Sequence, residues 1–149
     1  MKVVVSACLM GRNCKYNGGN NRNEKMIELL SGREIIEVCP EMEAGLKAPR
    51  KSVEIVKGRV CTRDGEDLDE VFRTGAKTVL ERISKEEIEF AVLQSRSPSC
   101  GVKQIYDGTF SGKLIPGQGI FAKELAAAGI PVIDVEDFTA SCKVPELII

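Results

Sequence analysis

The chain contains no histidine and no tryptophan among its 149 residues. Histidine is the commonest general base and a common zinc ligand, so acid–base chemistry is left to carboxylates, lysines, cysteines and tyrosines. No two cysteines have the CxxC spacing that is typical of zinc ribbons and of many ferredoxins. Any metal site must therefore use ligands that lie far apart in the sequence.

Long apolar runs are also missing. The longest purely apolar stretch is only a few residues, too short to span a bilayer, so we expect no membrane segment. The chain begins directly with strand-like sequence, without the apolar region and cleavage site of a signal peptide. We therefore expect a cytoplasmic protein, in which thiols stay reduced and cysteines more often serve metal binding or catalysis than disulfides.

The composition is that of an ordinary soluble domain, with 43% hydrophobic and 29% charged residues. No repeat, low-complexity tract or linker divides the chain, so we expect one domain over residues 1–149. The formal net charge of −1 does not indicate a nucleic-acid binder. Basic residues nevertheless gather near three cysteines, either as solvated loop charges or as a rim for an anionic substrate or cofactor: Arg12, Lys15, Arg22, Lys25, Lys47, Arg50 and Lys51.

Strand and helix patterns alternate along the chain. Strands are predicted at 2–7, 34–38, 89–94 and 131–135, and helices at 24–30, 67–84 and 119–128. Residues 53–62 predict a β-hairpin around Lys57-Gly58, and 105–119 an irregular or hairpin-like segment. The alternation predicts an α/β fold, a single Rossmann-like domain with a mainly parallel sheet and an inserted β-hairpin.

Three cysteines follow three of the predicted strands. Cys8 comes after Val3-Val4-Val5, Cys39 directly after 34–38, and Cys100 a short loop after 89–94. Ligands of open parallel sheets bind beyond the carboxyl ends of the strands, so these thiols are expected to converge. Three thiolates without an obvious fourth ligand indicate an iron–sulfur cluster with one open iron, or a catalytic thiol group.

The other cysteines are harder to assign. Cys14 lies in a polar loop six residues after Cys8, where it either ligates, assists or has no role. A structural zinc site made of Cys14 and the three strand-end cysteines is an alternative. Cys61 and Cys142 are expected to be small buried hydrophobic residues, the usual state of a free cysteine.

Two residues next to these cysteines carry groups suited to proton transfer. Glu41 lies two residues after Cys39, and Ser99 directly precedes Cys100. In a chain without histidine, Glu41 is the natural general acid or base. The alternative is that Glu41 is a charge favoured by the dipole at the start of a short helix opened by Pro40.

At these residues the chain resembles the DUF523 family, which includes thiouracil desulfidases. The matching motifs are SACLMG, KYNGG, CPE, SPSCG, IYDGTFSG and GQGIFAKEL followed by GIPV, and they span nearly the whole chain. The resemblance implies a [4Fe-4S] cluster with one iron not ligated by protein, held by the cysteines that match Cys8, Cys39 and Cys100. Lys15 and Asn17 replace a more usual arginine and aspartate, which affects the expected substrate range more than cluster binding.

The resemblance also implies a reaction, in which a thiocarbonyl nucleobase becomes its oxo form with release of hydrosulfide. Glu41 would activate the attacking water, and Ser99 would orient it or relay a proton. Candidate substrate-binding residues are Ser6, Cys14, Arg50, Tyr106 and Asp107. The expected substrate is a small thiolated nucleobase or nucleoside, with thiolated tRNA as a second possibility, and the expected protein a monomer or small oligomer.

Three other interpretations stay open. The same thiols would serve a persulfide sulfur carrier or a redox protein, a structural zinc protein, or a module that binds thiolated tRNA without turnover.

Overall fold

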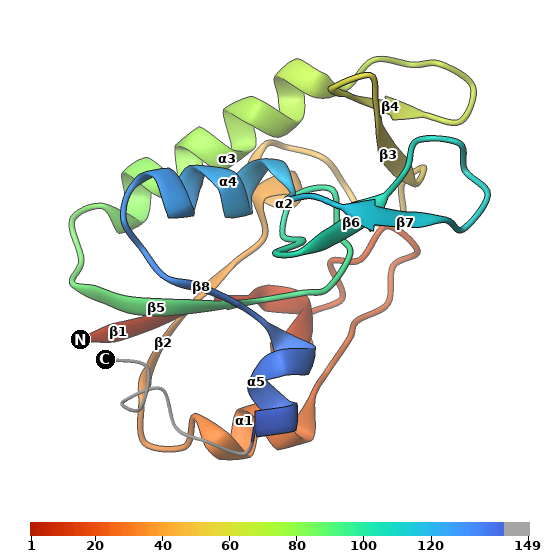
Figure 1. The fold of residues 1–149 in the computed structure, drawn as a ribbon. Coiled ribbons are helices and arrows are strands. Elements are labelled where there is room, and N and C mark those ends of the chain that lie inside the picture. Colours follow the sequence, from red (N-terminus) through yellow and green to blue (C-terminus); the bar gives the residue numbers. More distant parts are fainter. Residues whose placement is uncertain (142–149) are drawn as a thin grey trace.

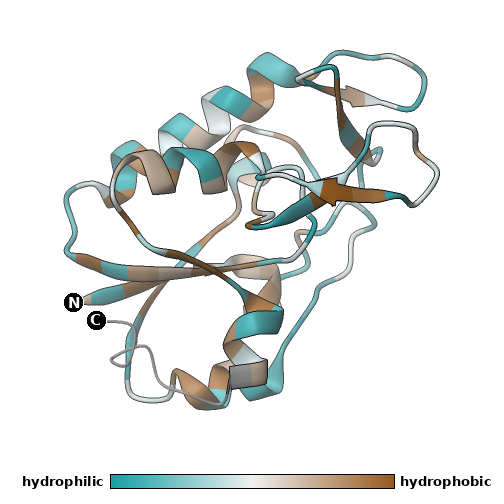
Figure 2. Ribbon diagram, viewed as in Figure 1, coloured by the Kyte–Doolittle hydropathy of each residue, from teal (hydrophilic) through white to brown (hydrophobic). Residues whose placement is uncertain are grey.

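The computed structural model describes residues 1–141, and Cys142 lies outside them. Its centre is a parallel sheet in the order β2-β1-β5-β8, formed by β1 (Lys2–Ser6), β2 (Glu34–Val38), β5 (Ile88–Leu93) and β8 (Val132–Asp134). The valines of β1 are fully buried because helices cover both faces of the sheet, and the sheet strands are largely coloured hydrophobic in Figure 2. The predicted α/β fold with a parallel sheet is confirmed.

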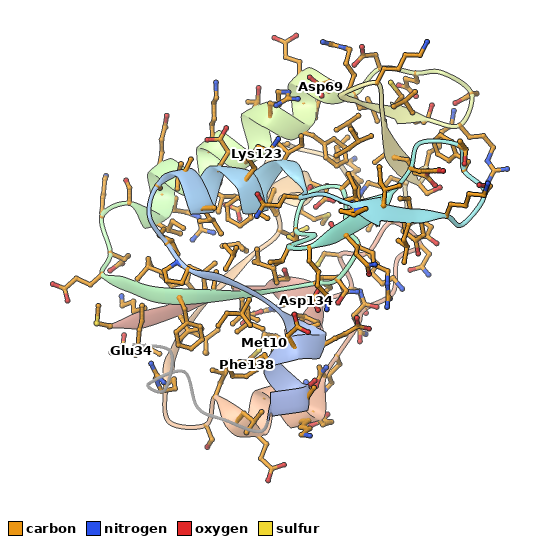
Figure 3. All side chains as sticks on the ribbon, viewed as in Figure 1. Met10, Glu34, Asp69, Lys123, Asp134 and Phe138 are labelled. Atoms are coloured by element: carbon orange, nitrogen blue, oxygen red, sulfur yellow. The ribbon has the colours of Figure 1, made fainter. Side chains whose placement is uncertain are left out.

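The helices form two layers around this sheet (Figure 1). On one face lie α2 (Pro40–Glu43), α3 (Asp69–Ile83) and α4 (Ile120–Ala127); on the other lie α1 (Glu24–Leu29) and α5 (Val135–Ser141). Because side chains alternate along a strand, Val4 packs into the first layer, while Val3 and Val5 pack into the second. Met10 and Phe138, labelled in Figure 3, belong to this second layer. No helix in residues 1–141 is long and apolar enough to cross a membrane.

Two hairpins lie beyond the carboxyl ends of the sheet strands (Figure 1). The first joins β3 (Val53–Val56) to β4 (Arg59–Thr62) through Lys57 and Gly58, which both have positive φ, 50° and 81°. These angles give the type I′ turn that suits a two-residue hairpin, so the predicted hairpin is confirmed. The second joins β6 (Gln104–Tyr106) to β7 (Leu114–Pro116), and β6 contacts β3.

The last strand is shorter than predicted. The expected strand over 131–135 ends at Asp134, because Val135 already begins α5. The Asp134 carboxylate accepts hydrogen bonds from the backbone N–H of Glu136 at 2.8 Å and from the Ser95 hydroxyl at 2.7 Å. A carboxylate that accepts a backbone N–H in this way starts a helix and stops the strand before it. Figure 3 shows Asp134 at the beginning of α5.

Cys61 differs from its expected state as well. It lies on the short strand β4 and is only half-buried, because this hairpin is covered on one side alone. It is a free thiol away from the cavity described below.

Gly75 allows α2 to pack closely on α3. A Cβ atom at Gly75 would lie 2.3 Å from the Pro40 carbonyl oxygen and 2.9 Å from the Ala44 Cβ. We expect Gly75→Ala to lower the free energy of unfolding by about 1–3 kcal/mol, because it forces α2 away from α3. Urea denaturation measures this change.

The exposed neighbour Thr74 provides the control for this prediction. Thr74→Ala should leave stability unchanged or slightly raised, because alanine favours helix. At a helix position with free space around it, replacing glycine by alanine stabilises the protein as well. A Gly75→Ala variant as stable as the natural protein would therefore contradict the close packing of α2 on α3.

Candidate metal and active site

A cavity of about 500 Å³ opens at the carboxyl ends of β1, β2 and β5. Its wall combines the loops that follow these strands with side chains from the two hairpins. The site residues expected from the sequence that line it are Ser6, Cys8, Cys14, Cys39, Glu41, Arg50, Cys100 and Tyr106. The three strand-end cysteines therefore reach one cavity from residues far apart in the sequence.

Short helices deliver the first two of these cysteines. Cys8 lies in the 3₁₀ helix η1 (Ala7–Met10), which ends at Gly11 with φ 98°. The Asn21 side-chain amide donates a hydrogen bond to Cys8 Sγ at 3.5 Å. Cys39 is the residue before α2, and Pro40 provides the first helical position, where no N–H is needed. Both thiols are thus held by the turns that end their strands.

The loop 97–101 delivers Cys100. The Ser97 hydroxyl accepts hydrogen bonds from the backbone N–H groups of Ser99 and Cys100, at 3.1 and 3.0 Å. The loop packs against the start of α4, where a Cβ at Gly119 would lie 2.5 Å from the Ser99 carbonyl carbon. Gly119 in the GQG motif thus leaves space for the backbone of the SPSCG motif.

Cys14 lies between Cys8 and Cys39. Its thiol is within hydrogen-bond reach of the Cys39 and Cys8 sulfurs, and these contacts, together with burial, raise the pKa of Cys14. Hydrogen bonding from Cys14, reinforced by Asn21 and opposed by burial, lowers the pKa of Cys8 to about 7. In the metal-free protein Cys14 therefore keeps its proton, while Cys8 readily becomes a thiolate.

Cys100 has a different environment. Burial raises the pKa of its thiol well above the usual value, and the negative charges of Glu41, Cys8 and Cys39 act in the same direction. A hydrogen bond with Ser6 opposes this rise. The Ser6 hydroxyl also accepts a hydrogen bond from the Gln94 N–H at 3.0 Å, which ties the end of β1 to the residue after β5. A positive centre among these sulfurs would relieve the repulsion.

This set of donors fits an iron–sulfur cluster. Such clusters are held by cysteine thiolates, and Cys8, Cys39 and Cys100 are free thiols at one cavity. In residues 1–141 no three cysteine or carboxylate side chains surround a point where one metal ion would bind. A donor set made of thiols suits a cluster, and a structural zinc site stays the alternative.

The two residues predicted for proton transfer differ in position. Glu41 is half-buried in the cavity wall, and its Oε2 lies 3.7 Å from Cys39 Sγ. Ser99 is 1% exposed and does not line the cavity, and its hydroxyl has no hydrogen-bond partner within residues 1–141. A ligand in the cavity can therefore contact Glu41, whereas Ser99 is buried behind the residues that line the cavity.

The remaining candidate residues also separate into two groups. Arg50 and Tyr106 line the cavity, and Arg50 Nη2 donates a hydrogen bond to the Cys14 carbonyl at 2.9 Å. Asp107 does not line it: its carboxylate accepts hydrogen bonds from the backbone N–H and the hydroxyl of Thr109, at 2.9 and 2.6 Å. These bonds lower the pKa of Asp107 and stabilise its own loop.

Sequence reasoning missed the cavity residues that the hairpins and the loop after β5 supply. These include Glu54, Arg63, Ser95, Arg96 and Phe110. The IYDGTFSG motif, which contains Phe110, was the one signal in the sequence that pointed to this residue. No local pattern, however, predicts where a hairpin packs against the rest of the protein. The cavity is thus assembled from strand ends, which are predictable, and from hairpins, which are not.

Comparison with known proteins identifies relatives over most of the chain. The profile of the 2-thiouracil desulfurase family matches residues 3–137. The solved structure of the [4Fe-4S]-dependent thiouracil desulfidase TudS is 35% identical, with a TM-score of 0.84 and coverage of 91% of each chain. The uncharacterized protein YbbK of Bacillus subtilis (strain 168) is 37% identical over 141 residues, which cover 88% of this chain and 93% of YbbK. The resemblance seen in the sequence is confirmed, and the chain belongs to the 2-thiouracil desulfurase family.

Proposed function

We propose that this protein is a [4Fe-4S]-dependent desulfidase that converts the thiocarbonyl group of a nucleobase or nucleoside to a carbonyl and releases hydrosulfide. The observation that carries the proposal is that Cys8, Cys39, Cys100 and Glu41 line one cavity of a chain in this family. The similarity to TudS, a thiouracil desulfidase that depends on such a cluster, supports it.

Cys8, Cys39 and Cys100 would hold the cluster. When bound by three thiolates, it supplies an iron without a protein ligand, a soft Lewis acid suited to sulfur. Asn21 orients Cys8 through its hydrogen bond, and Ser6 orients Cys100. Cys14 stays outside the ligand set in this proposal and keeps its proton beside Cys8 and Cys39.

Glu41 would provide the acid–base chemistry. Its carboxylate lies in the cavity wall next to Cys39, where it can accept a proton from water as the water oxygen bonds to the thiocarbonyl carbon. The C–S bond then breaks with its electron pair on sulfur, which leaves as hydrosulfide. Overall, a thiocarbonyl and water give a carbonyl and hydrogen sulfide, so no electron donor or acceptor is consumed.

Anaerobic reconstitution with iron and sulfide tests this proposal against its alternatives. We expect the visible absorption of an iron–sulfur cluster, followed by sulfide release from 2-thiouracil under the same conditions. A zinc protein would take up no cluster. A sulfur carrier or redox protein would release no free sulfide from 2-thiouracil. Either result would contradict the proposal.

The basic residues near the site bear on the size of the substrate. Two of them are already neutralised, because Arg12 pairs with Glu37 at 2.9 Å and Lys51 pairs with Asp64 at 3.0 Å. These pairs reduce the positive charge near the site, while Lys15 and Arg50 have no salt bridge within residues 1–141. The size of the substrate is therefore a matter for experiment, and we propose a small neutral base rather than tRNA.

Salt dependence tests this preference. We expect turnover of free 2-thiouracil to change less than about twofold between about 50 and 200 mM salt, because a neutral base releases no counterions on binding. We also expect no detectable binding of tRNA under these conditions, as measured by filter binding. Tight tRNA binding that weakens steeply with salt would instead indicate a thiolated tRNA substrate.

A further inference from the structure

Phe110 lines the cavity in a backbone conformation that bulky residues rarely adopt. Its φ is 56°, in the left-handed region, where a residue other than glycine is strained. Within residues 1–141 the other non-glycine residues with positive φ are Lys57, in a hairpin turn, and Arg96, which also lines the cavity. Strain of this kind persists only where the surroundings fix it, and it is typical of ligand-binding sites.

Glu54 on β3 fixes the loop that carries Phe110. One carboxylate oxygen, Oε1, accepts hydrogen bonds from the backbone N–H groups of Gly108 and Phe110, at 2.9 and 3.1 Å. A Cβ at Gly108 would lie 2.7 Å from the Ile55 carbonyl oxygen, so the loop packs tightly against the first hairpin. The Glu54 carboxylate thus holds the loop of the second hairpin in place through these two hydrogen bonds.

Arg63 holds the aromatic ring itself. Its guanidinium lies 5.5 Å from the ring centroid of Phe110, and Nη2 donates a hydrogen bond to the Phe110 carbonyl at 3.4 Å. Arg63 covers one face of the ring, and Phe110 is only half-buried. A core residue would be covered on all sides, so burial alone does not account for this strained and anchored ring.

The cavity therefore has two chemically different parts. The thiols and Glu41 come from the loops that follow the sheet strands, whereas Phe110 and Arg63 come from the hairpins. A thiolated pyrimidine also has two parts, a reactive thiocarbonyl and a flat conjugated ring. Flat heterocycles bind proteins by stacking on aromatic side chains.

We propose that Phe110 is the stacking surface for the planar ring of the substrate, with Glu54 and Arg63 as the residues that position it. This inference rests on the proposed desulfidase function and specifies its substrate class: conjugated planar thiocarbonyl rings rather than saturated ones. 5,6-Dihydro-2-thiouracil keeps the thiocarbonyl and both ring N–H groups but loses the flat conjugated ring. It is therefore the matched ligand for the test.

The test compares three variants of reconstituted protein by calorimetric binding and steady-state kinetics. Phe110→Ala and Phe110→Leu should bind 2-thiouracil about 5- to 100-fold more weakly, with KM raised and kcat little changed, because the stacking partner is lost. Phe110→Tyr keeps the ring and should stay within about twofold of the natural protein. Binding of the dihydro compound should change far less in all three.

These measurements also separate stacking from a structural role. If Phe110 merely stabilised its loop, Phe110→Ala would weaken both ligands equally, and Phe110→Leu would restore binding. Either result would overturn the proposal, and so would binding of 2-thiouracil by Phe110→Ala within about twofold of the natural protein.

The positioning residue Glu54 has its own pair of variants. Glu54→Gln keeps an oxygen that accepts the two N–H groups, so binding of 2-thiouracil should remain close to that of the natural protein. Glu54→Ala removes the acceptor and should weaken binding as much as Phe110→Ala. Equal behaviour of the two Glu54 variants would contradict its role in holding Phe110.

The proposed function and this inference can fail separately. If 2-thiouracil is desulfurised but Phe110→Ala keeps its KM, stacking fails and the desulfidase function stands. If 2-thiouracil binds in a Phe110-dependent way but releases no sulfide, the stacking site stands and the proposed reaction fails. Absence of any 2-thiouracil binding by the natural protein would overturn both.

Discussion

Glu41→Gln should lower the rate of thiouracil desulfidation by roughly a hundred- to ten-thousand-fold, the usual contribution of a general acid or base. Glutamine keeps the shape of the side chain and removes only its capacity to take up a proton. The cluster spectrum should be unchanged, because Glu41 touches Cys39 but is not a cluster ligand in this account. Single-turnover release of sulfide and the visible spectrum of the same sample measure the two effects.

Two control variants test whether the loss of rate is specific to Glu41. Glu43 lies in the same short helix but pairs with Arg82 at 2.9 Å outside the cavity wall, so Glu43→Gln should leave the rate nearly unchanged. Ser99→Ala should cost less than Glu41→Gln, because the Ser99 hydroxyl is buried behind the wall. If Glu41→Gln kept nearly full activity, the base would be sought elsewhere. Cys14 would then precede Asp107, because only Cys14 lines the cavity.

Serine at Cys8, Cys39 or Cys100 should remove most of the bound iron, because a cluster needs thiolate ligands and a hydroxyl is a poor replacement. Cys14→Ser should keep much of it, since three ligands leave the open iron that the proposed reaction requires. Iron content and visible absorption after anaerobic reconstitution measure this difference.

Cys14 makes this comparison informative, because interactions with two of the three proposed ligands, Cys39 and Cys8, raise the pKa of its thiol. Equal iron loss in all four variants would mean a fully ligated cluster with no position for substrate sulfur. Cys61→Ser is the matched control, since Cys61 is a free thiol on β4 away from the cavity, and its iron content should not change.

Much of the fold could be predicted because its signals are local. Three consecutive valines indicate a strand buried on both faces, and Lys57-Gly58 between two apolar runs indicates a hairpin. The last strand was predicted too long because apolar residues continue to Val135. The Asp134 side chain ends the strand there, and its hydrogen bonds are visible only in three dimensions.

The part of the site that could be predicted consists of the residues that directly follow the sheet strands. Cys8, Cys39, Cys100 and Glu41 follow strands of one parallel sheet, whose carboxyl ends share an edge. Side-chain position does not follow from sequence position, so nothing in the motifs indicated that Ser99 does not line the cavity. Phe110 was missed for a related reason, since its place depends on two hairpins docking on each other.

Desulfidation in water labelled with heavy oxygen distinguishes hydrolysis of the thiocarbonyl group from redox or sulfur-carrier chemistry. Reconstituted protein would be given 2-thiouracil without any reductant or oxidant, and the products analysed by mass spectrometry and a sulfide assay. We expect uracil that carries one labelled oxygen and an equal amount of hydrosulfide. Uracil formed only when an electron donor is added, or sulfur retained on the protein while uracil accumulates, would contradict the proposed hydrolysis.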